Sequence, residues 1–187
     1  MKKIIIFASG SGTNAENIMN YFNYSDEVEV TYVVTNNAEA YVIERAKKFD
    51  IPVKILEKGE LRSEEFRIFL NKNADFIVLA GFLMKVPDQI VADFPSKIVN
   101  IHPALLPKYG GKGMYGMHVH KAVVENKEKF SGITIHYVNE HYDEGAIIFQ
   151  QRVEVSPQDK PEDVANKIHD LEQAYFPGII DELIQNI

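Results

Sequence analysis

Asn100 and His102 are polar side chains separated by one apolar residue, directly before Pro103. The stretch KIVNIH at 97–102 predicts a strand that the proline ends. Alternate residues of a strand share one face, so the amide and the imidazole point the same way. An amide donor beside an imidazole can stabilise an oxyanion and exchange a proton. The alternative is that both side chains satisfy backbone groups where the strand ends.

A glycine-rich segment, GSGTN at 10–14, follows an apolar run and precedes a predicted helix. Glycine lets the backbone approach a ligand closely, and free N–H groups at a helix start can hold a phosphate. Gly12, Thr13 and Asn14 are therefore candidates for an anion site. The alternative is a tight turn in which Thr13 or Asn14 caps the helix. The segment lacks the third glycine of a dinucleotide fingerprint and the lysine of a P-loop.

Three further ionisable residues have weaker local support. Asp143 lies in the sequence HYDEG, where a solvated turn aspartate is the alternative to a functional one. His136 lies within the apolar stretch GITIHYV, which is typical of a partly buried core histidine. Glu172 lies at the edge of the apolar stripe of the last predicted helix. A carboxylate there is either a rim residue or a buried partner for a cation.

The sequence offers no expected metal site. The chain contains no cysteine, which excludes disulfides, thiolate ligands and cysteine nucleophiles. His118 and His120 lie at the start of a predicted helix. Residues two apart on a helix do not face each other, so these imidazoles are not expected to share a metal ion.

The first hundred residues alternate apolar runs with amphipathic segments. Strands are expected at 4–8, 28–35, 53–56, 76–81 and 97–102, with helices at 14–22, 39–49, 63–72 and 88–93. Such alternation predicts right-handed βαβ units and an open parallel sheet. The carboxyl edge of that sheet is where ligands bind, and Asn100 and His102 lie there.

The pattern changes after Pro103. A loop rich in glycine and proline is expected at 103–117, then a short helix near 118–126. Strands at 132–138 and 146–155 are joined by a turn and so are expected to be antiparallel. Pro161 suits the first turn of a final helix. The chain therefore predicts a single α/β domain over residues 1–187, with a Rossmann-like twisted sheet, parallel then mixed, and helices on both faces.

Charge and hydropathy exclude two classes of partner. The formal net charge is −7 and no basic run is present, so no nucleic-acid partner is expected. No stretch approaches the roughly 18 apolar residues that a membrane span requires. A cytoplasmic protein with small-molecule partners is the expectation.

Taken in order, several segments resemble the phosphoribosylglycinamide formyltransferase family. NIHPALLP is specific to the wider folate-dependent formyltransferases, and the glycine loop and the final-helix glutamate narrow the resemblance to this member. It covers nearly the whole chain. The segments are GSGTN at 10–14, AGF at 80–82, NIHPALLP at 100–107, HYDEG at 141–145 and EQAYFP at 172–177.

The resemblance implies roles for the matched positions. It implies that Asn100, His102 and Asp143 are catalytic, and that Asp143 favours the charged form of the His102 imidazole. It implies two further sets of residues. The substrate would be bound by Gly12, Thr13, Asn14, Glu172 and Arg62, and the folate by Leu83, Met84, Val86, Asn139, Glu140 and His141.

The chain departs from the family pattern at two positions and in one loop. Met84 stands where the family often has an arginine. Ser63 stands where another arginine is common, which leaves the neighbouring Arg62 as the candidate cation for the substrate phosphate. The loop at 108–117 is longer than in some relatives, and a flexible cover over the site is expected there.

The implied reaction moves the formyl group of 10-formyltetrahydrofolate, a co-substrate, to the amine of 5'-phosphoribosylglycinamide. The products are N-formylglycinamide ribonucleotide and tetrahydrofolate, in purine biosynthesis, by a monomer or homodimer without a metal. Two related activities remain open, methionyl-tRNA formyltransferase and formyltetrahydrofolate hydrolase. Both usually carry an extra domain, which is not expected here. A nucleotide-binding module without enzymatic activity would leave NIHPALLP and Asp143 without a role.

Overall fold

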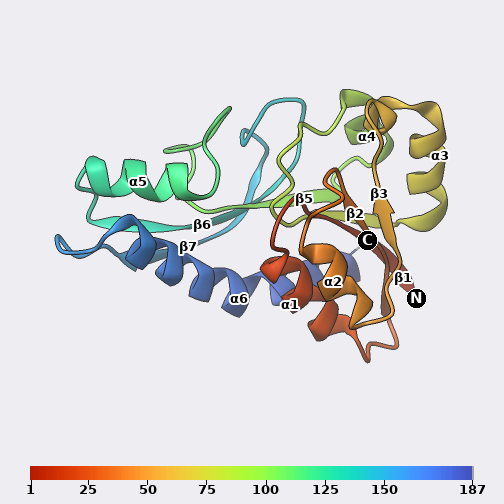
Figure 1. The fold of residues 1–187 in the computed structure, drawn as a ribbon, viewed down its shortest axis with the longest axis horizontal. Coiled ribbons are helices and arrows are strands. Elements are labelled where there is room, and N and C mark those ends of the chain that lie inside the picture. The colour runs from red at the N-terminus through yellow and green to blue at the C-terminus, as the bar shows by residue number, and fades with distance from the viewer. Residues whose placement is uncertain (187) are drawn as a thin grey trace.

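Strand β1 (Lys2–Phe7) lies inside the sheet because its last four residues are fully buried apolar side chains. The computed structural model describes residues 1–186. A seven-stranded sheet has the order β3-β2-β1-β4-β5-β6-β7 (Figure 1). The other strands are β2 (Val28–Thr35), β3 (Val53–Ile55), β4 (Phe76–Leu79), β5 (Ile98–His102), β6 (Phe130–Tyr137) and β7 (Ile147–Glu154).

The first five strands are parallel, and β6 and β7 run antiparallel to their neighbours. The change of direction follows from the connections. A short turn joins the antiparallel strands β6 and β7, whereas a long loop and the helix between residues 117 and 125 join β5 to its antiparallel neighbour β6. The expected parallel-then-mixed sheet is confirmed.

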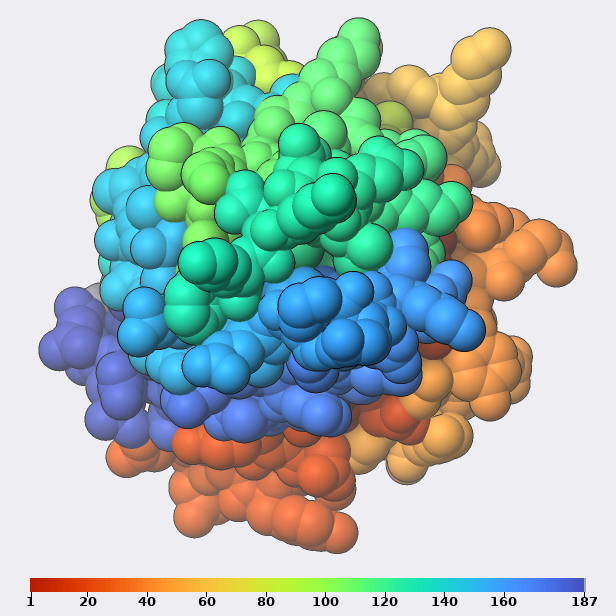
Figure 2. Space-filling view, turned by 90° about the vertical axis from the view of Figure 1, so that its left-hand side faces the viewer, coloured from red at the N-terminus to blue at the C-terminus, as the bar shows by residue number. Residues whose placement is uncertain are grey.

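Helices cover both faces of the sheet because the side chains of β1 alternate between two cores. Ile4 and Ile6 pack with α1 (Thr13–Phe22), α2 (Val42–Lys47) and α6 (Pro161–Gln185). Ile5 and Phe7 face α3 (Glu64–Asn73) and α4 (Asp88–Asp93) on the other side. Helix α5 (Met117–Glu125) lies beside α6 (Figure 2). A short 3-10 helix, η1 (Glu60–Arg62), precedes α3.

The expected helices and strands are all present, with shifted ends. Helix α2 begins at Val42, three residues later than expected. The residues before it form a turn, in which the N–H of Ala40 donates to the carbonyl oxygen of Asn37. Helix α1 begins at Thr13, with Gly12 as its N-cap residue and no side-chain cap. Neither Thr13 nor Asn14 caps the helix, so that alternative was wrong. Within residues 1–186, no helix is both long and apolar enough to cross a membrane.

Candidate active site

A cavity of about 810 Å³ opens at the carboxyl ends of β1, β4 and β5. Its position follows from the strand order, because the connections leave β1 in one direction and β4 in the other. Loops at such a switch point separate and leave a crevice. Asn14, Asn100, His102, Asp143 and Glu172 all line this cavity. Residues distant in the sequence thus meet at one place.

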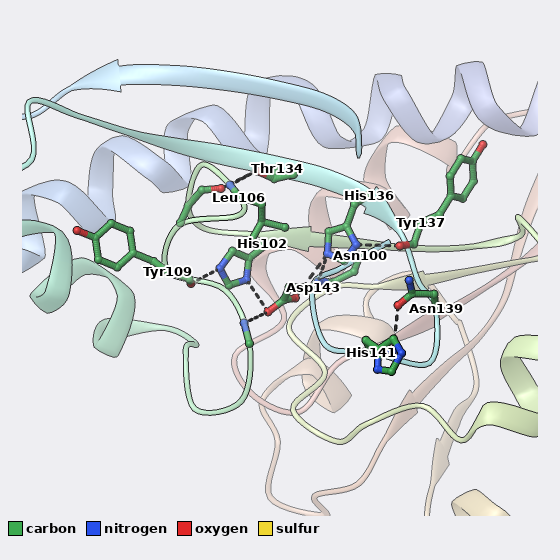
Figure 3. Close-up of polar contacts among 12 residues, drawn as sticks. Asn100, His102, Leu106, Tyr109, Thr134, His136, Tyr137, Asn139, His141 and Asp143 are labelled. Atoms are coloured by element: carbon green, nitrogen blue, oxygen red, sulfur yellow. Dashed lines mark hydrogen bonds and ion pairs between the residues drawn. The ribbon is translucent and has the colours of Figure 1, made fainter. Parts of the chain in front are cut away.

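Asn100 is oriented by an imidazole on the neighbouring strand. Antiparallel pairing of β5 with β6 places Asn100 opposite His136. His136 Nδ1 lies 2.9 Å from the carbonyl oxygen of Tyr137, which can only accept, so Nδ1 carries the hydrogen. In the neutral ring Nε2 then accepts from Asn100 Nδ2, 3.1 Å away (Figure 3). The second hydrogen of that amide nitrogen remains available to a ligand.

His102 is held by the backbone of the following loop. Its Nε2 lies 2.7 Å from the carbonyl oxygen of Tyr109, so Nε2 carries a hydrogen. Its Nδ1 faces Asp143, with 3.6 Å between Nδ1 and Oδ2. The side chain of His102 is only 4% exposed. Nδ1, which faces Asp143, is therefore the ring nitrogen that is available to accept a proton.

Asp143 lies between two imidazoles (Figure 3). Its Oδ1 lies 3.5 Å from His136 Nε2, and its Oδ2 accepts from the N–H of Gly111 at 2.9 Å. Its backbone has a φ of 58°, a left-handed conformation that aspartate tolerates better than most residues. A solvated turn aspartate would not be 12% exposed. The structure does not support that alternative for Asp143.

Burial decides the charge of His102 in the free protein. Burial lowers the pKa of His102 below its usual value, and Asp143 and the Tyr109 carbonyl oppose this without reversing it. The sequence correctly predicted that Asp143 raises the pKa of His102, but the prediction omitted the larger cost of charging a buried ring. His102 is therefore neutral at neutral pH before a substrate binds.

Asp143 stays charged. Burial pushes its pKa up, but contacts with His136, His102 and the Gly111 N–H outweigh burial and hold the pKa below the usual range. A carboxylate then faces the Nδ1 lone pair of a neutral His102. Protonation of Nδ1 converts this contact into an ion pair, so the two residues can take up and release one proton together.

Two residues of the glycine loop, Gly10 and Asn14, line the cavity, whereas Gly12 and Thr13 lie outside its lining. Gly12 has a φ of 75°, and a Cβ there would lie 2.4 Å from Cγ2 of Val42, so only glycine fits. No side chain caps the start of α1, which leaves its first N–H groups without a side-chain partner. Asn14 Nδ2 donates to Glu172 Oε2 at 2.9 Å. The loop and the final helix therefore meet at the cavity wall.

The cation beside this loop is Arg45. Its Nε donates to the carbonyl oxygen of Ser11 at 2.8 Å, and it also pairs with Glu16 and lies over the Tyr41 ring. Arg62 lies in η1 and does not line the cavity. Arg45 does not line the cavity either, so the role of Arg62 toward the substrate phosphate stays a prediction. Arg45 lies 34 positions beyond Ser11, and no local motif signals their contact.

The expected folate residues divide into two groups. Leu83, Met84, Val86 and Asn139 line the cavity, whereas Glu140 and His141 are exposed outside that lining. The Leu83 N–H donates to Ser9 Oγ at 2.9 Å, which fixes the loop after β4. The side chains of Leu83 and Met84 are exposed large apolar groups, so they are suited to cover a flat ligand.

Four residues of this region received no functional role from the sequence. His136 and Tyr109 act on Asn100 and His102, and Arg45 holds the glycine loop. His120 also lines the cavity and is 5% exposed, with no hydrogen-bond partner for its Nδ1. The hydrophobic stretch around His136 was correctly interpreted as a buried strand. Its function depends on the register with β5, which the sequence does not show.

Within residues 1–186, no group of three His, Asp or Glu side chains is arranged to hold a metal ion. The cavity instead combines an amide donor, an imidazole–carboxylate pair and an uncapped helix start. These groups suit transfer of an acyl-type group to or from an anionic ligand.

A family model and named relatives match nearly the whole chain. The model of the formyl transferase family matches residues 2–180. The chloroplastic phosphoribosylglycinamide formyltransferase of Arabidopsis thaliana is 40% identical, over 98% of this chain and 66% of that relative. The phosphoribosylglycinamide formyltransferase of Bacillus subtilis (strain 168) is 33% identical, over 98% of this chain and 95% of that relative.

A solved structure extends this similarity to three dimensions. The crystal structure of phosphoribosylglycinamide formyltransferase from Anaplasma phagocytophilum superposes with a TM-score of 0.89 at 31% identity, covering 99% of this chain and 88% of that one. The chain spans slightly less than two thirds of the plant relatives, 66% of the Arabidopsis protein and 61% of that of Vigna unguiculata. The family model, the relatives and the shared fold show that the chain belongs to the formyl transferase family, among the phosphoribosylglycinamide formyltransferases.

Proposed function

We propose that this protein transfers the formyl group of 10-formyltetrahydrofolate to the amine of 5'-phosphoribosylglycinamide. The products are N-formylglycinamide ribonucleotide and tetrahydrofolate, in purine biosynthesis. One observation carries the proposal: Asp143 lies between His102 and His136 in a cavity that also contains the glycine loop and Glu172. The relatives named above bear the corresponding activity in their names.

Asn100 and His102 act at the formyl carbon. The substrate nitrogen forms a bond to that carbon, and the former carbonyl oxygen becomes an oxyanion. The free hydrogen of Asn100 Nδ2 donates to this oxygen. Preorganised donors of this kind are worth about 10²–10³ in rate.

Asp143 and His102 move the proton. The attacking amine must lose a proton, and the folate N10 must gain one when its bond to the formyl carbon breaks. Nδ1 of the neutral His102 accepts the amine proton, and Asp143 stabilises the imidazolium that forms. The imidazolium then returns this proton to N10, which leaves as the amine of tetrahydrofolate. Acid–base help of this kind is worth about 10²–10⁴ in rate.

The remaining residues of the proposed site bind the two substrates. The N–H groups at the start of α1, at Gly12, Thr13 and Asn14, hold the phosphate, and Arg45 keeps the loop in place. Glu172 accepts a hydrogen bond from the substrate amine. Its side chain is 14% exposed, so a cationic or N–H group is a favourable partner.

The folate lies against the loop after β4. Leu83, Met84 and Val86 supply apolar contact for the pteridine ring, and backbone groups near Asn139 supply polar contact. Glu140 and His141 follow Asn139 in the chain and are exposed. We also propose that residues 1–187 form one formyltransferase domain, acting as a cytoplasmic monomer or homodimer; residue 187 lies outside the described residues.

An assay with three acceptors tests the function. The purified protein is supplied with 10-formyltetrahydrofolate and, separately, 5'-phosphoribosylglycinamide, charged methionyl-tRNA or water alone. Formylated product is expected only with the ribonucleotide. Formyl-methionyl-tRNA, or formate released without an acceptor, would instead assign one of the two related activities. Absence of all three products would contradict a formyl-transfer function.

A further inference from the structure

Tyr109 controls which nitrogen of His102 carries hydrogen in the free protein. Its carbonyl oxygen is the 2.7 Å partner of His102 Nε2. The hydrogen bond made by one ring nitrogen sets the protonation of the other. As long as this carbonyl remains in place, Nδ1 is left to face Asp143. The position of one backbone oxygen thus determines where the ring exchanges its proton.

That carbonyl belongs to a backbone conformation that needs support. Tyr109 has a φ of 58°, in the left-handed region that is unfavourable for a bulky residue by about 1–2 kcal/mol. An unsupported loop would relax from this conformation and move the carbonyl. The support must therefore come from contacts of the Tyr109 side chain or of its neighbours.

The Tyr109 side chain reaches a charged anchor outside the cavity. Its hydroxyl donates to Glu128 Oε1 at 2.9 Å, and Lys108 Nζ donates to the same oxygen at 2.9 Å. Glu128 lies between α5 and β6 and does not line the cavity. The Tyr109 ring also packs against the core beneath the sheet. The anchor is thus linked to the catalytic histidine through a single residue.

The charges of this anchor are stable around neutral pH. Burial and Glu128 raise the pKa of Tyr109 to about 12, so its hydroxyl remains a donor. Hydrogen bonds from Lys108 and from the Tyr109 hydroxyl lower the pKa of Glu128, so it remains a carboxylate. A charge-assisted hydrogen bond of this kind is stronger than a neutral one.

The same segment contacts Asp143. Gly111 donates its N–H to Asp143 Oδ2 at 2.9 Å. At Gly110, a Cβ would lie 2.6 Å from Leu106 Cδ2 and 3.3 Å from Asp143 Cβ, so this backbone passes directly against the carboxylate side chain. A shift of residues 109–111 would disturb both partners of the proton exchange.

We infer that Tyr109 and Glu128 are positioning residues for the proposed formyl transfer. The bond between the Tyr109 hydroxyl and the Glu128 carboxylate holds the Tyr109 carbonyl against His102 Nε2. The inference rests on the proposed function only where it refers to formyl transfer. The effect on the His102 ring exists without any substrate.

Three variants and one control test the inference. Tyr109→Phe removes only the hydroxyl, Glu128→Ala removes the acceptor, and Glu128→Gln keeps an acceptor oxygen without charge. Tyr21→Phe is the matched control, because the Tyr21 hydroxyl donates to Asp181 at 3.1 Å on an exposed surface away from the cavity. Circular dichroism and thermal melting establish that each variant is folded.

The first readout is ¹⁵N NMR of the His102 ring without substrate. The wild type and Tyr21→Phe should show hydrogen on Nε2. Tyr109→Phe and Glu128→Ala should show a mixture of the two tautomers and a lower His102 pKa, because the carbonyl that favours the charged ring has moved. Glu128→Gln should restore most of the wild-type pattern. An unchanged tautomer and titration in folded Tyr109→Phe and Glu128→Ala would overturn the inference.

The second readout separates turnover from binding. In Tyr109→Phe and Glu128→Ala, kcat should fall roughly tenfold, a part of the 10²–10⁴ that acid–base catalysis supplies, while both KM values stay within about twofold. Loss confined to KM would contradict a positioning role. A wild type without formyl-transfer activity would count against the proposed function alone, since the NMR comparison needs no reaction.

Discussion

Asp143, His102, His136 and Asn100 form one connected polar group in which each member restricts another. His136 fixes the Asn100 amide, and the Tyr109 carbonyl fixes the His102 ring. The Asp143 carboxylate faces both imidazoles. At the residue scale, the group therefore holds its donors in place before a substrate arrives, which is the condition for effective electrostatic stabilisation.

His136→Phe should reduce turnover although His136 does not transfer a proton. Phenylalanine fills a similar volume but offers no acceptor to Asn100 Nδ2, so the amide can rotate away from the oxyanion. We expect kcat to fall about 10- to 100-fold, somewhat less than complete loss of an oxyanion donor, with smaller changes in KM. Steady-state kinetics measure both. His136→Gln keeps a polar group at the position and should recover part of kcat; equal loss in both variants would count against the orienting role.

At the scale of elements, the strand β6 holds the catalytic loop as well as the sheet. Thr134 is fully buried, and its hydroxyl donates to the Ala104 carbonyl at 2.7 Å. It also accepts from the Leu106 N–H at 3.0 Å and from Gln150 Nε2 at 2.9 Å. The segment after His102 is thereby tied to β6 and β7. A single buried hydroxyl positions the loop that carries Tyr109.

Thr134→Val should therefore reduce stability and activity together. Valine has the same shape but leaves the buried Leu106 N–H without its hydroxyl partner, at a cost of about 1–3 kcal/mol. Urea denaturation measures the loss, and steady-state assays should show a lower kcat. Ile135→Val on the same strand is the control, with about 0.5–1.5 kcal/mol lost and kcat retained. A stable, fully active Thr134→Val protein would disprove this role.

The sequence predicted elements better than contacts between them. The buried strands were identified because their runs of valine and isoleucine are long and bounded by turns, as at 28–35. Helix starts were less certain, since the left-handed Gly12 rather than a side chain begins α1. The contact of Arg45 with Ser11 was not predicted, because it depends on packing between α2 and the glycine loop. His136 was missed for the same reason, through the register of β5 and β6.

At the scale of the whole molecule, burial lowers the pKa of two histidines, His102 and His120. The downward shift of the His102 pKa could not be derived from the neighbouring residues in the sequence, because the whole fold is needed to exclude water from the ring. His120 is affected in the same way. Burial lowers its pKa, against an opposing effect of Glu172. Two buried neutral histidines therefore connect the stability of the protein to pH.

The free energy of unfolding should fall as the pH drops below about 6.5, the value for an unfolded histidine. In that range the unfolded chain binds protons that His102 and His120 exclude, so stability increases with pH. The stability contributed by the two neutral rings is fully present above about pH 6.5, and it is lost as the pH falls toward their lowered pKa values. The raised pKa of His169 acts oppositely, but its side chain is 43% exposed and solvent screens its pairing with Glu172.

Urea denaturation at pH 7.5 and pH 5.5 measures this dependence. His120→Gln should reduce the difference between the two free energies, because it removes one of the two groups. His118→Gln changes an exposed side chain of the same helix and should leave the difference as in the wild type. A stability that is constant or rises on acidification would contradict the role of the buried rings.

The most direct test of formyl transfer through this site follows a ¹³C-labelled formyl group in a single turnover. Wild-type protein and Asp143→Asn are each mixed in excess with labelled 10-formyltetrahydrofolate and 5'-phosphoribosylglycinamide. The label should move to the ribonucleotide amide in the wild type and at least about 100-fold more slowly in Asp143→Asn, whose substrate binding is retained because only the proton-transfer partner is lost. Formyl transfer through this site would be contradicted if the label stayed on the folate or left as formate in the wild type. Equal rates in the two proteins would also contradict it.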